Sequence, residues 1–223
     1  MYFKTISIGK QGSRNDLAKA FAAALAEELG WEQSSSTSDV QYVRKPNSEA
    51  YFAFCADGSV VWVVSDIGGI AAKSSSSIHN TVPWTSNNTY CLDIAFGKAS
   101  VAVGIRKSDS ALKLTTIIAE NEKGEDKAID YHSNSSSGAY PYDYYADGFV
   151  EGKEYRLTAN RDADTGVSLV KAPDIYGGCV FKDLYIVCST PFSGTNQTFC
   201  IDGKYYRYVS GDVKDGGFAI RVG

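Results

Sequence analysis

The apolar residues near the start of the chain follow the period of a helix. Four of them recur at every fourth position: Leu17, Phe21, Leu25 and Leu29. Residues with this spacing share one face of a helix. Ser13 precedes the stripe as a candidate N-cap, and Gly30 follows it as a candidate C-cap. The pattern predicts an amphipathic helix that packs its apolar face on a sheet.

The rest of the chain has the pattern of short strands separated by turns. Three hairpins are indicated, with paired strands at 51–55 and 60–64, at 91–96 and 101–105, and at 112–119 and 127–131. Further strands are expected at 2–8, 155–159, 167–170, 179–188, 197–201, 204–209 and 218–222. Strand 60–64 is apolar on both faces, so we expect it to be central and covered by the helix. The predicted fold class is β-rich α+β, with antiparallel sandwich or barrel-like sheets and one N-terminal helix packed on a sheet.

One long segment interrupts this regular spacing. Residues 133–148 are rich in Ser and Tyr, and a loop of this length inside a compact protein is usually functional or disordered. We treat 1–223 as one β-rich unit. The alternative is a division into 1–132 (strand, helix and hairpins) and 149–223 (a C-terminal β part), joined by the 133–148 loop.

The charge balance and the hydropathy of the chain argue against two classes of function, nucleic-acid binding and membrane insertion. The chain has 22 basic and 26 acidic residues, a net charge of −4, so we expect no nucleic-acid contact, which requires clustered Lys and Arg. We expect no membrane insertion, because no apolar run approaches the roughly 20 residues of a spanning helix. The N-terminus has no apolar leader region, which predicts a soluble protein made in a cytoplasm.

The cysteines and histidines show no pattern of a metal site or of a catalytic nucleophile. Five cysteines without a C-x-x-C pair (Cys55, Cys91, Cys179, Cys188 and Cys200) are expected to be small core residues, with a disulfide among the last three as the alternative. The two histidines, His79 and His132, lie in Ser-rich segments with no nucleophile motif. We therefore predict no catalytic residues, no metal site and no cofactor.

Three other patterns resemble functional motifs but lack required parts. The turn at 9–13 has neither the glycine spacing nor the Lys-Ser/Thr of a phosphate loop, so we interpret it as a turn into the helix cap. Asp162, Asp164 and Gly166 match a fragment of a calcium loop without its later Glu. A carboxylate pair for sugar hydrolysis could come only from four acidic residues near the long loop: Asp143, Asp147, Glu151 and Glu154.

The tyrosines are the unusual feature of the composition. The chain has 15 of them, and four crowd the long loop: Tyr140, Tyr142, Tyr144 and Tyr145. Tyr beside Ser, Gly and Asn is typical of contact surfaces, because its ring supplies area at low entropic cost. These four are our candidate contact residues for a partner or a glycan, with folding of the rings over a sheet edge as the alternative. Tyr205, Tyr206 and Tyr208 lie on a predicted strand and are expected to serve packing.

The C-terminal third resembles the end of phage and prophage virion proteins. The similar stretches are RLTANRDADTGVSLVKAPDIYGGCVFKDLYIV and QTFCIDGKYYRYVSGDVKDGGFAIRVG. In that family a glycine precedes a strand, a hairpin follows, and an aliphatic-Arg strand ends the chain; here these parts are 177–178, 201–206 and 218–221. The opening strand, the Ala-rich helix and the Phe-Cys-Ala-Asp-Gly-Ser hairpin also fit. The resemblance covers about a third to a half of the chain and carries no catalytic residues.

This resemblance implies a non-enzymatic virion subunit of the tail, neck or baseplate, assembled in the host cytoplasm. We expect its partners to be copies of itself and other virion proteins, in a ring or sleeve. The alternative function is a carbohydrate-binding or receptor-binding module that holds a host-surface glycan with the loop from Tyr140 to Tyr145. A hydrolase that uses Asp143 or Glu154 ranks third.

Overall fold

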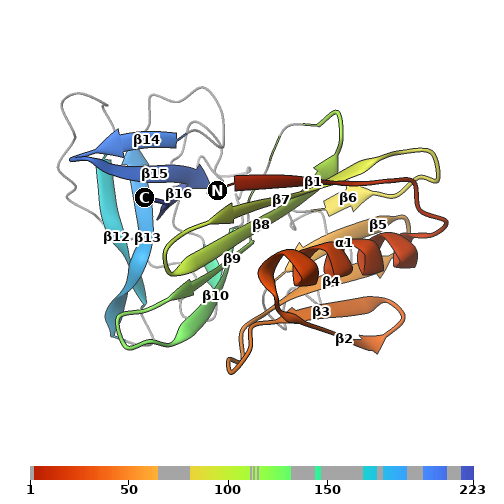
Figure 1. Cartoon of the computed structure of the whole chain (residues 1–223), viewed down its shortest axis with the longest axis horizontal. Coiled ribbons are helices and arrows are strands. Elements are labelled where there is room, and N and C mark those ends of the chain that lie inside the picture. Colours follow the sequence, from red (N-terminus) through yellow and green to blue (C-terminus); the bar gives the residue numbers. More distant parts are fainter. Residues whose placement is uncertain are drawn as a thin grey trace.

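The described part of the chain forms one helix and three antiparallel sheets (Figure 1). The computed structural model describes residues 3–64, 81–110, 112, 114, 116–131, 144–146, 168–174, 178–189, 198–209 and 217–223. The predicted β-rich α+β class is confirmed. The strands stack as sandwich-like layers.

The three sheets differ in size and in their place along the chain. The central sheet has the order β1 (Phe3–Ile8), β7 (Tyr90–Phe96), β8 (Ser100–Lys107), β9 (Thr116–Glu120), β10 (Asp126–Tyr131), β11 (Tyr144–Ala146). The helix-side sheet has the order β2 (Glu32–Thr37), β3 (Val40–Arg44), β4 (Tyr51–Asp57), β5 (Val60–Val64), β6 (Thr81–Pro83). The C-terminal sheet has the order β12 (Ser168–Asp174), β13 (Cys179–Ser189), β16 (Gly217–Arg221), β15 (Lys204–Val209), β14 (Thr198–Ile201).

The helix α1 (Arg14–Leu29) begins and ends at the predicted caps. The Ser13 hydroxyl accepts a hydrogen bond from the Asp16 backbone N–H at 3.1 Å, which satisfies one of the free donors of the first turn. Gly30 ends the helix with φ of 66°, a left-handed conformation that a residue without Cβ adopts at little cost. The local sequence therefore sets both ends of α1.

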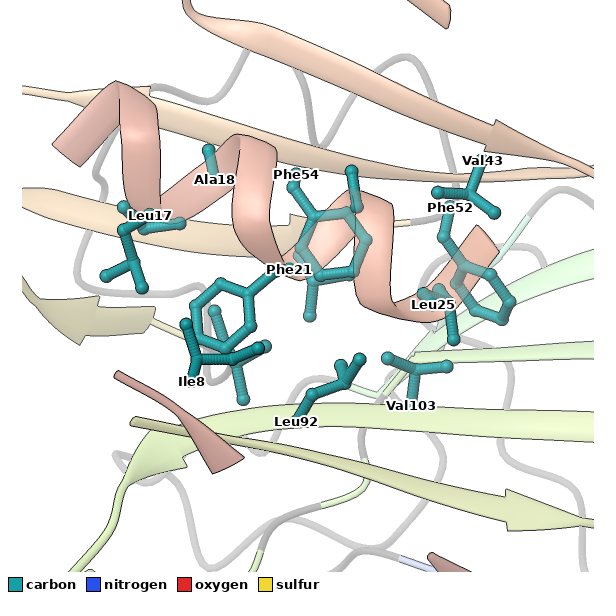
Figure 2. Packing of buried hydrophobic residues seen from close by; sticks show 14 of the residues in the cluster. Ile8, Leu17, Ala18, Phe21, Leu25, Val43, Phe52, Phe54, Leu92 and Val103 are labelled. Atoms are coloured by element: carbon teal, nitrogen blue, oxygen red, sulfur yellow. The ribbon is translucent and has the colours of Figure 1, made fainter. Parts of the chain in front are cut away.

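The helix lies between two sheets rather than on one (Figure 2). Leu17, Phe21 and Leu25 are fully buried, as the period-four stripe predicts, while Leu29 is only partly buried. The Phe21 ring stacks at 5.9 Å on Phe54 of the helix-side sheet and meets Tyr90 of the central sheet edge-on at 6.3 Å. One side chain thus joins the helix to both sheets.

The central sheet is covered on both faces. Leu92 and Ile94 face the helix-side core, together with Val103 and Ile105 of the paired strand. The opposite face packs on the C-terminal sheet in a second core. Residues of this core are Ala95, Ala102, Ile117, Ala119, Phe181, Leu184, Phe218 and Ile220. The central sheet is therefore the middle layer of the fold (Figure 1).

The three predicted hairpins are confirmed, with one correction to the third. The first strand of the third hairpin begins at Thr116, because residues 112 and 114 are not in strand conformation, so the predicted start at 112 was wrong. The sequence analysis also missed β2, β3 and β6. All six side chains of β2 are exposed, so its Glu-Gln-Ser-Ser-Ser-Thr sequence carries no apolar alternation. The strand predicted at 155–159 lies outside the described residues.

We predict that Phe21→Ala lowers the free energy of unfolding by about 3–5 kcal/mol, because it removes a buried ring between two sheets. Lys19→Ala, an exposed position on the same helix, should change it by less than about 0.5 kcal/mol. Urea denaturation followed by circular dichroism measures both values. Equal losses in the two variants would contradict the role given to Phe21.

Candidate interaction surface

The described part of the predicted Tyr loop is a strand at the end of the described central sheet. Tyr144 and Tyr145 lie in β11, which pairs antiparallel with β10 so that Tyr144 is opposite Tyr131 and Tyr145 is opposite Asp130. In the sheet order, β11 comes last, after β10. Tyr140 and Tyr142 lie outside the described residues. The backbone of β11 therefore extends the central sheet at the point where the sequence predicts a contact.

Hydrogen bonds fix the tip of the β9–β10 hairpin, whose strand β10 pairs with β11. The Asn121 side-chain oxygen accepts hydrogen bonds from the backbone N–H groups of Lys123 and Glu125, each at 2.9 Å. The backbone N–H of Glu122 donates to the carbonyl of Val180 in the C-terminal sheet at 2.9 Å. These bonds satisfy polar groups that the tight turn would otherwise leave unpaired. They also join the hairpin to a neighbouring sheet.

An ion pair fixes β10 from the other side. The Lys45 ammonium lies 2.6 Å from the carboxylate of Asp126, the first residue of β10. Lys45 directly follows β3, so this contact connects the central sheet to the helix-side sheet. Contacts from both outer sheets thus hold the hairpin that supports β11.

A buried carboxylate joins the C-terminal sheet to the β7–β8 turn. Asp183 of β13 is 3% exposed, and its Oδ2 accepts hydrogen bonds from the Ala99 N–H at 2.6 Å and the Ser100 hydroxyl at 3.2 Å. Its other oxygen, Oδ1, has no hydrogen-bond partner among the described residues. Burial raises the pKa of this carboxyl, although the hydrogen bonds oppose the rise. The carboxylate gives the turn a fixed position on the C-terminal sheet.

This contact leaves no room for a side chain at Gly97. A Cβ built there would lie 2.3 Å from the Ser100 hydroxyl oxygen and 2.6 Å from Asp183 Oδ2. Both distances are far below van der Waals contact, so the turn accepts only glycine without a shift of its neighbours. The sequence analysis identified 97–99 as a hairpin turn but not the approach of Asp183.

A second buried carboxylate sits in the middle of the central sheet. Asp93 is fully buried and accepts hydrogen bonds from the Thr5 hydroxyl and from Arg106 Nε, both at 2.6 Å. Burial alone would lower the pKa of Arg106, but the hydrogen bond and charge of Asp93 outweigh it and the pKa is raised. Arg106 also donates to the carbonyls of Ser108 and Ser110, each at 3.0 Å. The group is a paired structural charge in the interior.

The face of the helix-side sheet that points away from α1 carries a small cationic–aromatic cluster, which the sequence analysis missed and which borders a buried apolar cluster. The Arg44 guanidinium lies 5.2 Å from the centre of the Tyr42 ring and 4.9 Å from that of Tyr51. The two rings meet edge-on at 5.3 Å. The β-forming residues Val40, Tyr42 and Val43 are a strand signal for β3, but the register of β3 and β4 is what brings Tyr51 beside Arg44.

The remaining predicted residues divide into packing roles and undescribed positions. Tyr206 and Tyr208 are buried as expected for a strand, whereas Tyr205 is 53% exposed. Cys55 and Cys91 are buried, which confirms them as core residues, while Cys200 is exposed. Several candidates lie outside the described residues: His79, His132, Asp143, Asp147, Glu151, Glu154, Asp162, Asp164 and Gly166. The side chain of Cys188 also lies outside them.

In the described ranges, no three His, Cys, Asp or Glu side chains are grouped in a way that could hold a metal ion. The same residues contain no helix with the length and apolar character that crossing a membrane requires.

No protein-family model matches this chain, and neither does any curated protein.

We predict that Gly97→Ala lowers the free energy of unfolding by about 1–3 kcal/mol, because the new methyl group would overlap Ser100 and Asp183. Gly9→Ala is the matched control, since a Cβ at Gly9 meets no atom within 4 Å. Thermal and urea denaturation of both variants measure the difference. A Gly97→Ala variant as stable as the Gly9→Ala variant would show that the turn is not tightly held.

We predict that the stability of the wild type relative to Asp183→Asn falls as the pH rises. The pKa of Asp183 is raised in the folded state, so folding binds the proton more tightly than the unfolded chain does. This contribution is fully present below the ordinary carboxyl pKa and is lost as pH rises through the folded value. Asn keeps an acceptor for Ala99 and Ser100 and cannot ionise.

The measurement is urea denaturation of both proteins from about pH 4 to pH 7, with the difference taken at each pH. Other carboxylates contribute equally to both proteins and cancel. A difference that stays constant, or that grows in favour of the wild type with rising pH, would refute the prediction.

Proposed function

We propose that this chain is a non-enzymatic structural subunit of a phage or prophage-derived particle, in its tail, neck or baseplate. In this proposal it assembles into a ring or sleeve through β-sheet contacts and the Tyr-rich loop. Its partners are copies of itself and other virion proteins, without nucleic acid or membrane contact, and its location is the virion, which is assembled in the host cytoplasm. The resemblance of the C-terminal residues to virion proteins supports this class.

The observation that carries the proposal is the position of Tyr144 and Tyr145 in a strand at the end of a sheet. An edge strand has a row of backbone N–H and C=O groups directed away from its own sheet. A strand from a second subunit can add to such a row, while alternate side chains supply specificity. Tyrosine is also among the residues that contribute most binding energy in protein interfaces.

The contacts that fix the β9–β10 hairpin favour a role for β11 in binding a second subunit. The hairpin that pairs with it is bonded to the C-terminal sheet through Glu122 and to the helix-side sheet through the Lys45–Asp126 pair. A strand held by the body of the protein loses little freedom when a partner binds, so less of the interaction energy is offset by ordering. Repetition of one such contact around an axis closes a ring.

We predict that the wild-type chain forms a species several times heavier than the 24.1-kDa monomer. The double variant Tyr144→Ser/Tyr145→Ser should weaken this association at least tenfold, on the order expected for loss of interface tyrosines. Size-exclusion chromatography with light scattering over a concentration series measures the change. Folding of the variant is checked by circular dichroism and thermal denaturation.

Tyr205→Ser is the matched control, because it removes an exposed tyrosine from a different sheet. It should leave the association unchanged. A wild type that is strictly monomeric, both alone and in isolated particles, would overturn the proposal. Monomeric chain with glycan-array binding that Tyr142→Ala/Tyr144→Ala abolishes would favour the carbohydrate-binding alternative instead.

A further inference from the structure

The Arg44 guanidinium lies against two aromatic rings, and its N–H donors are available to a ligand. It lies over the Tyr42 and Tyr51 rings, at 5.2 Å and 4.9 Å from their centres, and its side chain is exposed. None of the ion pairs or side-chain hydrogen bonds of the described residues involves it. A guanidinium has five N–H donors in a planar fork that matches a carboxylate. The two ring contacts restrict the positions that this fork adopts.

The positions around Arg44 supply further polar groups on the same face of the sheet. Cross-strand partners share a face, so the register puts Glu32 beside Arg44, and Ser34 beside Tyr42. Both β2 residues are exposed. The surface thus offers a cation, two phenol rings, a hydroxyl and a carboxylate within two neighbouring cross-strand rows of β2, β3 and β4.

We propose that the cluster of Tyr42, Arg44 and Tyr51 binds the carboxylate of an acidic sugar. Arg44 pairs with the carboxylate through two parallel N–H···O bonds. The phenol rings contact the apolar edge of the sugar ring, and the Ser34 hydroxyl and Glu32 carboxylate pair with its hydroxyl groups. The site lies on the helix-side sheet and is separate from the Tyr-rich strand β11 in the central sheet.

The charge around the cluster favours a carboxylate over a phosphate. Glu32 stands opposite Arg44 in the strand register, so it repels an incoming anion and repels a doubly charged one more strongly. A singly charged group that also carries hydroxyls gains the Arg44 contact and uses Glu32 as an acceptor. A bare phosphate has no such compensation.

A site with one bidentate contact and two partly exposed rings binds weakly when alone. Its affinity is expected in the millimolar range, because few groups are buried and only one charge is paired. Many copies on one particle would raise the effective affinity by orders of magnitude without any new contact. The single-site affinity is nevertheless measurable on the isolated chain, so the test does not depend on assembly.

The probes are D-galacturonic acid and D-galactose, which differ in the carboxylate at one carbon, with acetate and inorganic phosphate as further arms. Titration of the ¹⁵N-labelled chain by NMR measures each affinity, and the shifted amides should lie in β3 and β4. We expect galacturonate to bind at least tenfold more tightly than galactose, acetate or phosphate. Equal binding of galactose, or tighter binding of phosphate, would overturn the proposal.

Three variants separate a bidentate site from general charge attraction. Arg44→Gln should lower galacturonate affinity at least tenfold, and Arg44→Lys should lower it several-fold because the ammonium lacks the planar fork. Lys204→Gln removes one positive charge from an exposed position on the C-terminal sheet and should leave the affinity unchanged. Unchanged binding by Arg44→Gln, or an equal loss in Lys204→Gln, would overturn the proposal. Arg44 is exposed, so these variants should fold normally.

Discussion

The burial of the central sheet on both faces is the constraint on which the rest of the structure depends. One face packs on the helix and the helix-side sheet, and the other packs on the C-terminal sheet. A strand such as β7 must then be apolar in both directions, and six of its seven residues are buried. Burial at about 25 cal/mol per Å² makes these two cores the main source of stability. The helix serves this arrangement because it fills the space between two sheets.

The two buried carboxylates at this middle layer, Asp93 and Asp183, both accept hydrogen bonds, and these contacts join separate parts of the chain. Asp93 connects β7 to Thr5 of β1 and Arg106 of β8. Asp183 connects the C-terminal sheet to a turn of the central sheet. A buried carboxylate costs free energy unless hydrogen bonds compensate it, so these contacts specify which groups meet rather than adding much net stability. They give the layers one relative placement.

In a fold of three packed layers, the surfaces available for binding a partner or ligand are the sheet edges and the faces that point away from the cores. The Tyr-rich strand β11 lies at an edge and suits strand addition by another subunit, in keeping with the proposed assembly. The cluster around Arg44 lies on an outer face and suits a small anionic ligand. The two surfaces belong to different sheets, so a particle built from this chain could use one for assembly and the other for attachment.

The sequence by itself determined the helix with both caps, the three hairpins and the strand-rich class, because these follow from local spacing and turn residues. Only the tertiary structure decided that α1 lies between two sheets, since the stripe from Leu17 to Leu25 is the same in either case. Strand β2 escaped prediction because its polar residues gain their conformation from pairing with β3. The sequence located Tyr144 and Tyr145 as contact candidates, but their strand conformation depends on pairing with β10, which the loop composition does not indicate. Arg44, Tyr42 and Tyr51 meet only when β3 and β4 align, and no local pattern encodes that register.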